Sequence, residues 1–298
     1  MSSPLAGAPP SAAVSPRGVP AIGAPGRAAQ ELPAGEPPVV PAVPDHALSE
    51  YSTADLEIRA ASVRGLMHRY RGQPRQDAFS VSHDQSSDTT IVVVCDGVGS
   101  LPRSHEAAAF VVGRLPGHYW THREWPEAVK AVNAELQEFV EGRPTDLDHA
   151  EQHVDGMATT VVAVAVSPSP AGRTASIVRS DDSTAWLLTP DGDWTAVSVD
   201  AEGDDAVHTG SVRALPADSP RLHYSEAEFG EGALFVMTDG VGRPLASSAE
   251  VRDALANWWS SPPSIFEFAS HVGFARKSHM DDRTVVGLWS VSDRSDPA

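Results

Sequence analysis

Short apolar stretches separated by polar turns run along most of the chain, and their spacing predicts both strands and helices. Strands are indicated by stretches rich in Val, Ile and aromatic residues, at 54–65, 77–84, 89–96, 157–166, 173–180, 184–189, 194–199, 233–239 and 284–291. Apolar positions every three to four residues predict helices at 104–120, 125–142, 248–260 and 263–277. Short Pro/Gly turns favour antiparallel pairing, and the order of elements predicts a layered α+β domain with helices covering sheets.

The N-terminal part of the chain has a different composition. Residues 1–50 hold 11 of the 25 prolines, with Ala, Gly and Ser between them, and show no apolar periodicity. Such a segment buries too little apolar surface to offset the entropy lost on ordering. We therefore expect a flexible tail over 1–50, one domain over 51–292 and a C-terminal tail over 293–298. The acidic stretch 200–230 is predicted to be irregular.

Charge and cysteine content narrow the possible partners. The formal charge of −18 and the pI of about 4.9 make nucleic acid and anionic membranes unfavourable partners. No apolar run approaches the ~20 residues that span a bilayer, and the N-terminus lacks the pattern of a signal peptide. The single cysteine, Cys95, excludes an internal disulfide and fits a reducing compartment. We expect a cytoplasmic protein in which Cys95 is an inert core thiol.

Two segments 143 residues apart end an apolar stretch in Asp-Gly, namely VVVCDGVGS at 92–100 and FVMTDGVGR at 235–243. A carboxylate at the end of a strand lies at a sheet edge, and the Gly after it lets the backbone approach a ligand closely. With the acidic segment SHMDDRTVVG at 278–287, they predict a carboxylate cluster for hard divalent cations. Asp-Gly is also a common turn pair, so either segment alone is open to a plain structural interpretation.

Six short motifs occur in a fixed order. They are G-x-x-H…Q-D-A at 65–78, D-G-x-G at 96–99, A-T-T at 158–160, D-S-x-x-W at 182–186, T-D-G at 238–240 and D-D-x-T at 281–284. This series resembles the metal-dependent protein phosphatase family, type 2C, from about residue 55 to 291. The resemblance implies a four-layer αββα sandwich. In it, two antiparallel sheets pack face to face between helix pairs, with metals at one end.

The resemblance also implies a reaction and its residues. Two Mg²⁺ or Mn²⁺ ions roughly 3.5–4 Å apart would activate a bridging water that attacks phosphoserine or phosphothreonine directly. By similarity, Asp96 would bridge both ions and the Gly97 carbonyl would bind the second. Asp239 and Asp281 would complete the first site, and Asp77 would hold metal-bound water. Asp96 and Asp239 are thus the expected catalytic carboxylates.

Two features of the resemblance leave alternatives open. Asp182 resembles a turn residue that can hold a weaker third ion. However, Asp181 replaces a Gly there, and Arg243 stands where the family often has an acidic residue. The third ion is therefore an open expectation. Of the neighbours Asp281 and Asp282, the family pattern favours the first as ligand and leaves the second as a hydrogen-bonded supporting residue.

The remaining candidates surround the early Asp. Gln76 replaces a Glu of the family, and Val98 stands where some members carry a His. His68 is a candidate for phosphate binding or proton transfer, or alternatively a structural His. At least one neighbouring arginine is expected to bind phosphate through its planar fork, the candidates being Arg69, Arg71 and Arg75. The A-T-T threonines, Thr159 and Thr160, are expected to support the site from a buried strand.

These patterns predict a monomeric, Mg²⁺- or Mn²⁺-dependent serine/threonine protein phosphatase. Its partners would be a phosphoprotein substrate, namely a Ser/Thr kinase or one of that kinase's targets. Three alternatives remain. Gln76, Val98 and the altered arginine region favour a catalytically weak or inactive phosphatase-fold protein that acts as a regulatory binding module. The others are a small-molecule phosphomonoesterase and a purely structural β-sandwich.

Overall fold

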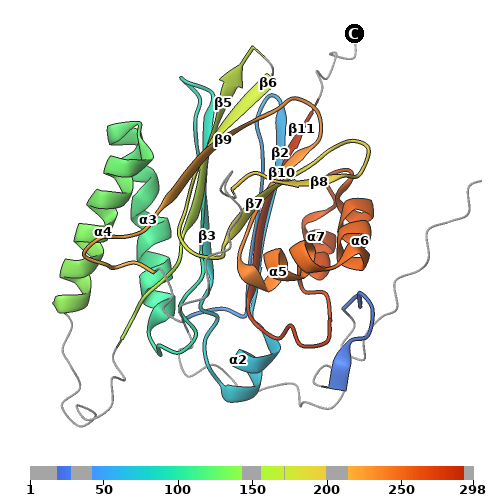
Figure 1. Ribbon diagram of the computed structural model, residues 1–298, viewed down its shortest axis with the longest axis horizontal. Helices are drawn as coiled ribbons and strands as arrows, with labels where there is room; N and C mark the ends of the chain where they lie inside the picture. The colour runs from blue at the N-terminus through green and yellow to red at the C-terminus, as the bar shows by residue number, and fades with distance from the viewer. Residues whose placement is uncertain (1–18, 28–41, 143–155, 171, 199–213, 292–298) are drawn as a thin grey trace, which may run out of the picture.

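Two antiparallel β-sheets lie face to face at the centre of the molecule (Figure 1). The structure, a computed structural model, describes residues 19–27, 42–142, 156–170, 172–198 and 214–291. One sheet has the order β1-β2-β11-β10-β7-β8, formed by His46–Ser52, Leu56–Val63, Arg283–Ser290, Ala233–Met237, Thr184–Leu188 and Trp194–Ala196. The other has the order β3-β4-β5-β6-β9, formed by Ala78–Asp84, Thr89–Cys95, Val162–Ser169, Gly172–Arg179 and His223–Phe229.

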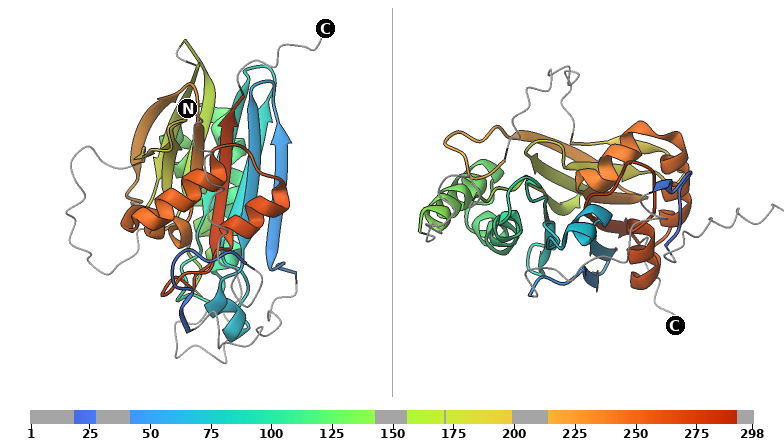
Figure 2. Two further views of the ribbon diagram at one scale, coloured as in Figure 1. Left: turned by 90° about the vertical axis from the view of Figure 1, so that its right-hand side faces the viewer. Right: turned by 90° about the horizontal axis from the view of Figure 1, so that it is seen from below.

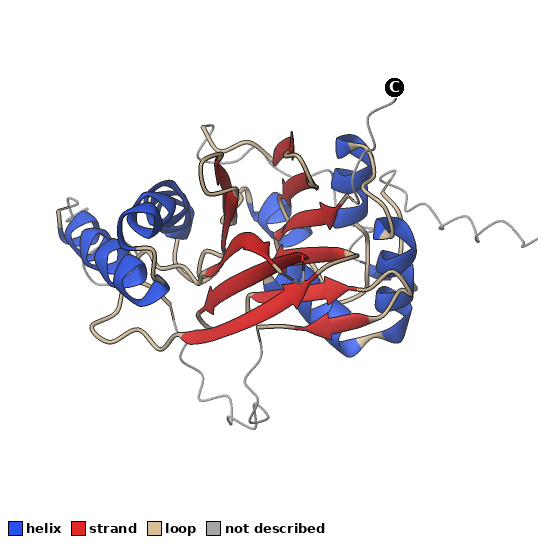
Figure 3. Ribbon diagram, turned by 90° about the horizontal axis from the view of Figure 1, so that it is seen from above, coloured by secondary structure: helices blue, strands red, loops and turns tan. Residues whose placement is uncertain are grey.

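Helices cover the outer face of each sheet. On the five-stranded sheet lie α3 (Ser104–His122) and α4 (Trp125–Glu141). On the six-stranded sheet lie α5 (Asp239–Ser247), α6 (Ala249–Trp259) and α7 (Ile265–Val272). Figure 3 shows the helix–sheet–sheet–helix layers from above. The short helix α2 (Leu66–Arg71) lies across one end of the strands (Figure 2). The predicted αββα sandwich is therefore confirmed.

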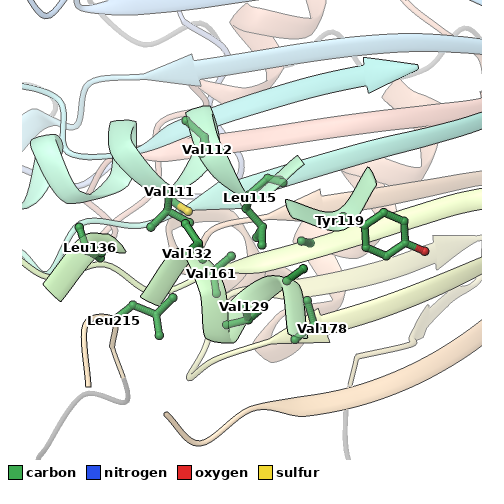
Figure 4. Packing of buried hydrophobic residues seen from close by; sticks show 14 of the residues in the cluster. Val111, Val112, Leu115, Tyr119, Val129, Val132, Leu136, Val161, Val178 and Leu215 are labelled. Carbon is green, nitrogen blue, oxygen red and sulfur yellow. The ribbon is translucent and has the colours of Figure 1, made fainter. Parts of the chain in front are cut away.

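Strand β4 shows how the sequence builds these layers. All seven of its residues are buried, and successive side chains of a strand point to opposite faces of the sheet. Ile91, Val93 and Cys95 accordingly pack into the cluster under α3 and α4, part of which Figure 4 shows. Val92 and Val94 instead enter the core between the sheets. Burial raises the pKa of the Cys95 thiol, as expected for an inert core cysteine.

The main differences from the predicted elements are two edge strands and two helices, the short α2 and α5. β1 and β9 are the outermost strands of their sheets, and most of their side chains are exposed or half-buried. An edge strand needs few apolar residues, so its sequence signal is weak. β9 lies within the stretch predicted to be irregular. The helix α5 starts at Asp239 and contains Gly240 and Pro244, which are typical of turns.

Part of the predicted N-terminal tail is ordered against the domain. The buried Ile22 donates its N–H to the Ala275 carbonyl (3.2 Å), and two further backbone hydrogen bonds join residues 20–24 to residues 275–277. Composition hides this docking because backbone hydrogen bonds need no apolar periodicity. β1 also begins at His46, so the predicted boundary at residue 50 lies inside a strand. Residues 1–18 and 28–41 of the predicted N-terminal tail, the whole predicted C-terminal tail, and residues 199–213 of the acidic stretch lie outside the described residues.

Within the described part of the chain, no helix is both long enough and apolar enough to cross a membrane.

Candidate metal and phosphate site

Four of the predicted metal ligands come from strand ends at one end of the sandwich. Asp77 directly precedes β3 and Asp96 directly follows β4; these strands pair so that Ala78 lies opposite Cys95. Likewise, Asp239 follows β10 and Asp281 precedes β11, and Met237 lies opposite Val285. Because antiparallel pairing places the start of one strand beside the end of its neighbour, two distant chain segments deliver four carboxylates to the same region.

These carboxylates lie close enough to repel one another. Loss of solvent raises the pKa of Asp96 well above its ordinary value, and the charges of Asp77, Asp239 and Asp281 raise it further. Burial likewise raises the pKa of Asp239 to about 6; Asp182 adds to the shift and Arg243 opposes it. The contact between the Asp96 and Asp239 carboxyl groups raises the pKa of Asp96 further and lowers that of Asp239. A cluster of like charges with raised pKa values is the electrostatic condition that a cation relieves.

Asp77 is fixed by two threonines that the sequence did not single out. Its Oδ2 accepts hydrogen bonds from Thr238 Oγ1 (2.9 Å) and Thr284 Oγ1 (2.8 Å). The backbone N–H of Thr284 also donates to Thr238 Oγ1 (3.1 Å), which ties the two threonines together. Both threonines belong to motifs found in the sequence, T-D-G and D-D-x-T. Their fixed spacing from the Asp of each motif could have indicated that they support the site.

Two buried oxygen atoms beside this arrangement lack a donor. Among the described residues, neither Asp77 Oδ1 nor Gln76 Oε1 has a hydrogen-bond partner, although Asp77 and Gln76 are only 3% and 1% exposed. A buried acceptor without a donor is costly and calls for an explanation. A hard divalent cation, or water bound to it, supplies what such oxygens require. Gln76 thus keeps the oxygen function of the Glu that it replaces.

The A-T-T segment holds the backbone of the first Asp-Gly segment in place through hydrogen bonds. The Asp96 carbonyl accepts hydrogen bonds from Thr159 Oγ1 (2.9 Å) and from the N–H of Thr160 (2.8 Å). Two residues after Asp96, the N–H of Val98 donates to the Ala158 carbonyl (2.9 Å). Both threonines are buried, in line with the supporting role expected of them.

Asp281 and Asp282 have different environments. Asp281 is exposed, whereas Asp282 is buried. The Asp282 carboxylate accepts the N–H groups of Gly65 and Gln76, each at 2.6 Å. Its Oδ1 also lies 2.9 Å from His68 Nδ1. Asp282 therefore joins α2 to the segment that carries Asp77, which leaves Asp281 free to act as a ligand.

The contacts of His68 favour the structural alternative. Its side chain is only 8% exposed and is directed at Asp282. Burial opposes protonation of the ring, but the contact with Asp282 outweighs it, so the pKa of His68 is raised. This contact with Asp282 agrees with the structural alternative for His68.

Two motif glycines allow three backbones to meet at this point. A Cβ on Gly65 would lie 2.3 Å from the carbonyl carbon of Asp281, and one on Gly240 would lie 2.0 Å from the carbonyl oxygen of Asp282. No side chain tolerates such distances. The backbone of residues 281–282 thus passes between the starts of α2 and α5, and only glycine permits it.

The three candidate phosphate-binding arginines have different positions. Arg75 is buried, and its guanidinium donates to Ser62 Oγ and to the carbonyls of Asp77 and Pro44, so it is occupied in holding the backbone of Asp77. Arg71 is exposed at the end of α2. Arg69 lines a cavity of about 360 Å³ together with Asp281, which makes it the candidate best placed near a predicted ligand.

Asp182 contacts an arginine instead of the other carboxylates. Nη2 of Arg243 forms a close ion pair with Asp182 Oδ2, and Nη1 lies 3.0 Å from Asp239 Oδ2. The sequence offered no signal for this pairing, because the two partners are 61 residues apart.

Across the part of the chain that the structure describes, no three acidic, His or Cys side chains already stand together at metal-binding geometry. The donor set nevertheless consists of carboxylate, carbonyl and amide oxygens, which suit Mg²⁺ and Mn²⁺. Together with the two unpartnered buried oxygens, this chemistry fits the ions that the sequence predicts.

Comparisons with known proteins agree with this fold and this region. The model of a family described as protein phosphatase 2C matches residues 64–264, more than half of the chain. No curated protein sequence matches.

Several solved structures are similar to the whole domain. RsbX in complex with magnesium shares 14% identity at a TM-score of 0.54, covering 82% of this chain and 100% of that one. The S. agalactiae serine/threonine phosphatase shares 16% identity at 0.55, covering 78% and 99%. The catalytic domain of the serine/threonine protein phosphatase PstP, solved with 2 manganese ions, shares 22% identity at 0.52, covering 80% and 100%. At these identities the structures establish the fold.

Proposed function

The chain belongs to the protein phosphatase 2C family, and from this premise we propose that it is a Mg²⁺- or Mn²⁺-dependent serine/threonine protein phosphatase. The observation that supports the proposal best is the group of mutually repelling carboxylates beside two buried oxygens that lack a donor. Its substrates would be phosphoproteins, either a Ser/Thr kinase or the proteins that such a kinase phosphorylates. We propose that it acts as a monomer.

Each residue of the cluster has a defined task in this proposal. Asp96, Asp239, Asp281 and the Gly97 carbonyl would hold two ions, and Asp77 would fix water beside them. When bound, such ions would activate a water as the nucleophile and neutralise the phosphate dianion. The hydroxyls that hold Asp77 Oδ2 leave its Oδ1 free to face this water.

Recognition of the phosphate is assigned to Arg69 among the candidate arginines. Its Nε and Nη2 contact the Arg64 carbonyl (3.0 Å) and the His46 ring (3.2 Å) at the wall of the cavity that Asp281 also lines. The guanidinium of Arg75 is instead buried and directed at backbone carbonyls and Ser62. An arginine fork binds two phosphate oxygens at once, which both orients the substrate and offsets its charge. Arg69→Ala should therefore raise KM for a phosphopeptide more than it lowers kcat.

The proposal is tested by phosphate release from a phosphothreonine peptide with Mn²⁺, with Mg²⁺ and with EDTA. We expect turnover with metal, none with EDTA, and a loss of at least about 100-fold in Asp239→Asn, because a ligand to the activating ion is removed. The matched control is Asp253→Asn, which makes the same chemical change at an exposed position of α6 and should leave turnover intact.

Two outcomes would favour the alternatives. A folded wild-type protein that binds Mn²⁺ but releases no phosphate from any peptide or small phosphoester would be a phosphatase-fold binding module. Faster turnover of small phosphomonoesters than of phosphopeptides, compared by kcat/KM, would indicate a small-molecule phosphatase.

A further inference from the structure

One arginine bridges two carboxylates at the edge of the predicted metal centre. Arg243 lies one helical turn after Asp239 in α5, and its Nη1 is 3.0 Å from Asp239 Oδ2. Its Nη2 forms a close ion pair with Asp182 Oδ2, in the turn that joins β6 to β7. A single guanidinium therefore occupies the space between the two acidic side chains.

The backbone on both sides brings these partners together. A Cβ on Gly242 would lie 2.6 Å from Thr184 Oγ1, so the first turn of α5 packs tightly against the start of β7. On the other side, the guanidinium of Arg179 donates to the carbonyl of Asp181, whose φ of +52° is a conformation that Asp tolerates better than most residues. Asp182 is thus presented to α5 by a fixed turn.

Stability alone does not account for the arrangement. The Arg243 side chain is 64% exposed and that of Asp182 is 33% exposed, and ion pairs at such exposure contribute little to folding. What the guanidinium does supply is positive charge among carboxylates that repel one another. The guanidinium of an arginine stays charged at any ordinary pH, and here it contacts both Asp239 and Asp182.

From this geometry we propose that Arg243 takes the place of a third metal ion and limits the centre to two ions. The inference rests on the proposed metal-dependent function. Asp182 was the predicted ligand of a third ion, but its Oδ2 already contacts Arg243, and a divalent cation sharing Asp182 would lie beside a fixed positive charge. The residues at this corner therefore fit a guanidinium and not a further ion.

The contacts of Arg243 agree with this assignment. Its guanidinium places a positive charge between two acidic side chains of the centre. Arg243 is thus a positioning residue, which keeps Asp182 and Asp239 in place without a third ion.

The test counts bound Mn²⁺ per chain at saturation, by isothermal titration calorimetry and by metal analysis after equilibrium dialysis. The wild type should bind two ions and Arg243→Asp three, since this change removes the cation and adds an oxygen ligand beside Asp182. The double variant Arg243→Asp/Asp182→Asn should return to two. Arg114→Ala removes a comparably exposed arginine, 60% exposed and paired with Glu135 on another face, and should stay at two.

The outcomes separate this inference from the proposed function. A wild type that binds three ions overturns the role of Arg243 and leaves the metal-dependent function standing, whereas a wild type that binds none overturns both. A count of two in folded Arg243→Asp, or of three in the double variant, also refutes the inference. Asp182→Asn alone gives a second measurement in an otherwise native chain. It should still bind two ions, and loss of an ion would show that Asp182 is a ligand.

Discussion

Exchanging Asp281 and Asp282 for Asn, one at a time, separates metal binding from folding at two adjacent carboxylates. Asp281 is exposed, while Asp282 is 3% exposed and accepts two backbone N–H groups at 2.6 Å beside His68. The same chemical change should therefore have opposite consequences. Asp281→Asn should weaken Mn²⁺ binding and leave stability unchanged, whereas Asp282→Asn should destabilise the fold.

The magnitude for Asp282→Asn follows from its hydrogen bonds. Asn keeps one acceptor oxygen, but its NH₂ group would face the N–H of either Gly65 or Gln76. One charge-assisted hydrogen bond is lost, and one buried N–H is left without an acceptor, each costing about 1–3 kcal/mol. The two losses overlap, so we expect about 2–4 kcal/mol in total. At about 2–4 °C per kcal/mol for a domain of this size, Tm should fall by roughly 5–15 °C.

The assay is thermal unfolding in EDTA, combined with calorimetric titration of Mn²⁺ into each variant. EDTA removes the contribution of bound metal to Tm, which would otherwise mask the difference. In Asp281→Asn, Tm should stay within about 2 °C of the wild type, since an exposed substitution changes little. The Kd for Mn²⁺ should rise at least about tenfold because a direct ligand loses its charge. An unchanged Tm in Asp282→Asn, or unfolding of Asp281→Asn, would refute the distinct roles of the two residues.

Three further predictions test the surroundings of the site. Gly240→Ala should lower the free energy of unfolding by about 3 kcal/mol or more, because its Cβ would meet a backbone carbonyl oxygen at 2.0 Å. Gly113→Ala has open space in α3 and should raise that energy by about 0.5–1 kcal/mol; urea unfolding measures both. Thr284→Val removes a donor to Asp77 and should raise the Kd for Mn²⁺ about tenfold, by calorimetry. Burial raises the pKa of Asp239 from 3.8 to about 6, so the unfolded chain releases this proton first. As the pH rises from about 4 to about 6, metal-free wild type should then lose stability relative to Asp239→Asn. Equal pH profiles of the two proteins in urea unfolding would contradict this.

The layers of the fold could be predicted because buried elements carry a strong pattern. β4 is apolar on both faces, since it lies between a helix layer and a second sheet, and α4 shows an apolar stripe with Pro126 in its first turn. Edge strands such as β1 carry no such pattern, because they bury little. Local composition also cannot show that residues 20–24 pair with 275–277, since most of the hydrogen bonds between them are backbone hydrogen bonds.

A site residue could be predicted only where its side-chain type and its position at the end of a strand both indicated the same role. Asp96 and Asp239 follow strands, so their place at a sheet edge was readable from the sequence. The tasks of Arg75 and Arg243 depend instead on partners fixed by tertiary structure. Arg75 turns inward to the Asp77 carbonyl, and Arg243 meets Asp182 across 61 residues. An arginine near a predicted phosphate site therefore indicates positive charge there, but the sequence does not show which group its guanidinium binds.

The motifs themselves do not distinguish an enzyme from a binding module, because several of their residues are required for folding. Gly240 must lack a side chain to let the backbone of Asp282 pass, and Asp282 itself joins separate segments; an inactive protein with this fold would need both. Asp239 is different. Its raised pKa means that its ionised form opposes folding at neutral pH, and Asn would fill the same space without that cost. A carboxylate that weakens the fold and lies among others of its kind is explained by binding a cation, so Asp239, more than the order of the motifs, argues for a metal site, and turnover then separates an enzyme from a binding module.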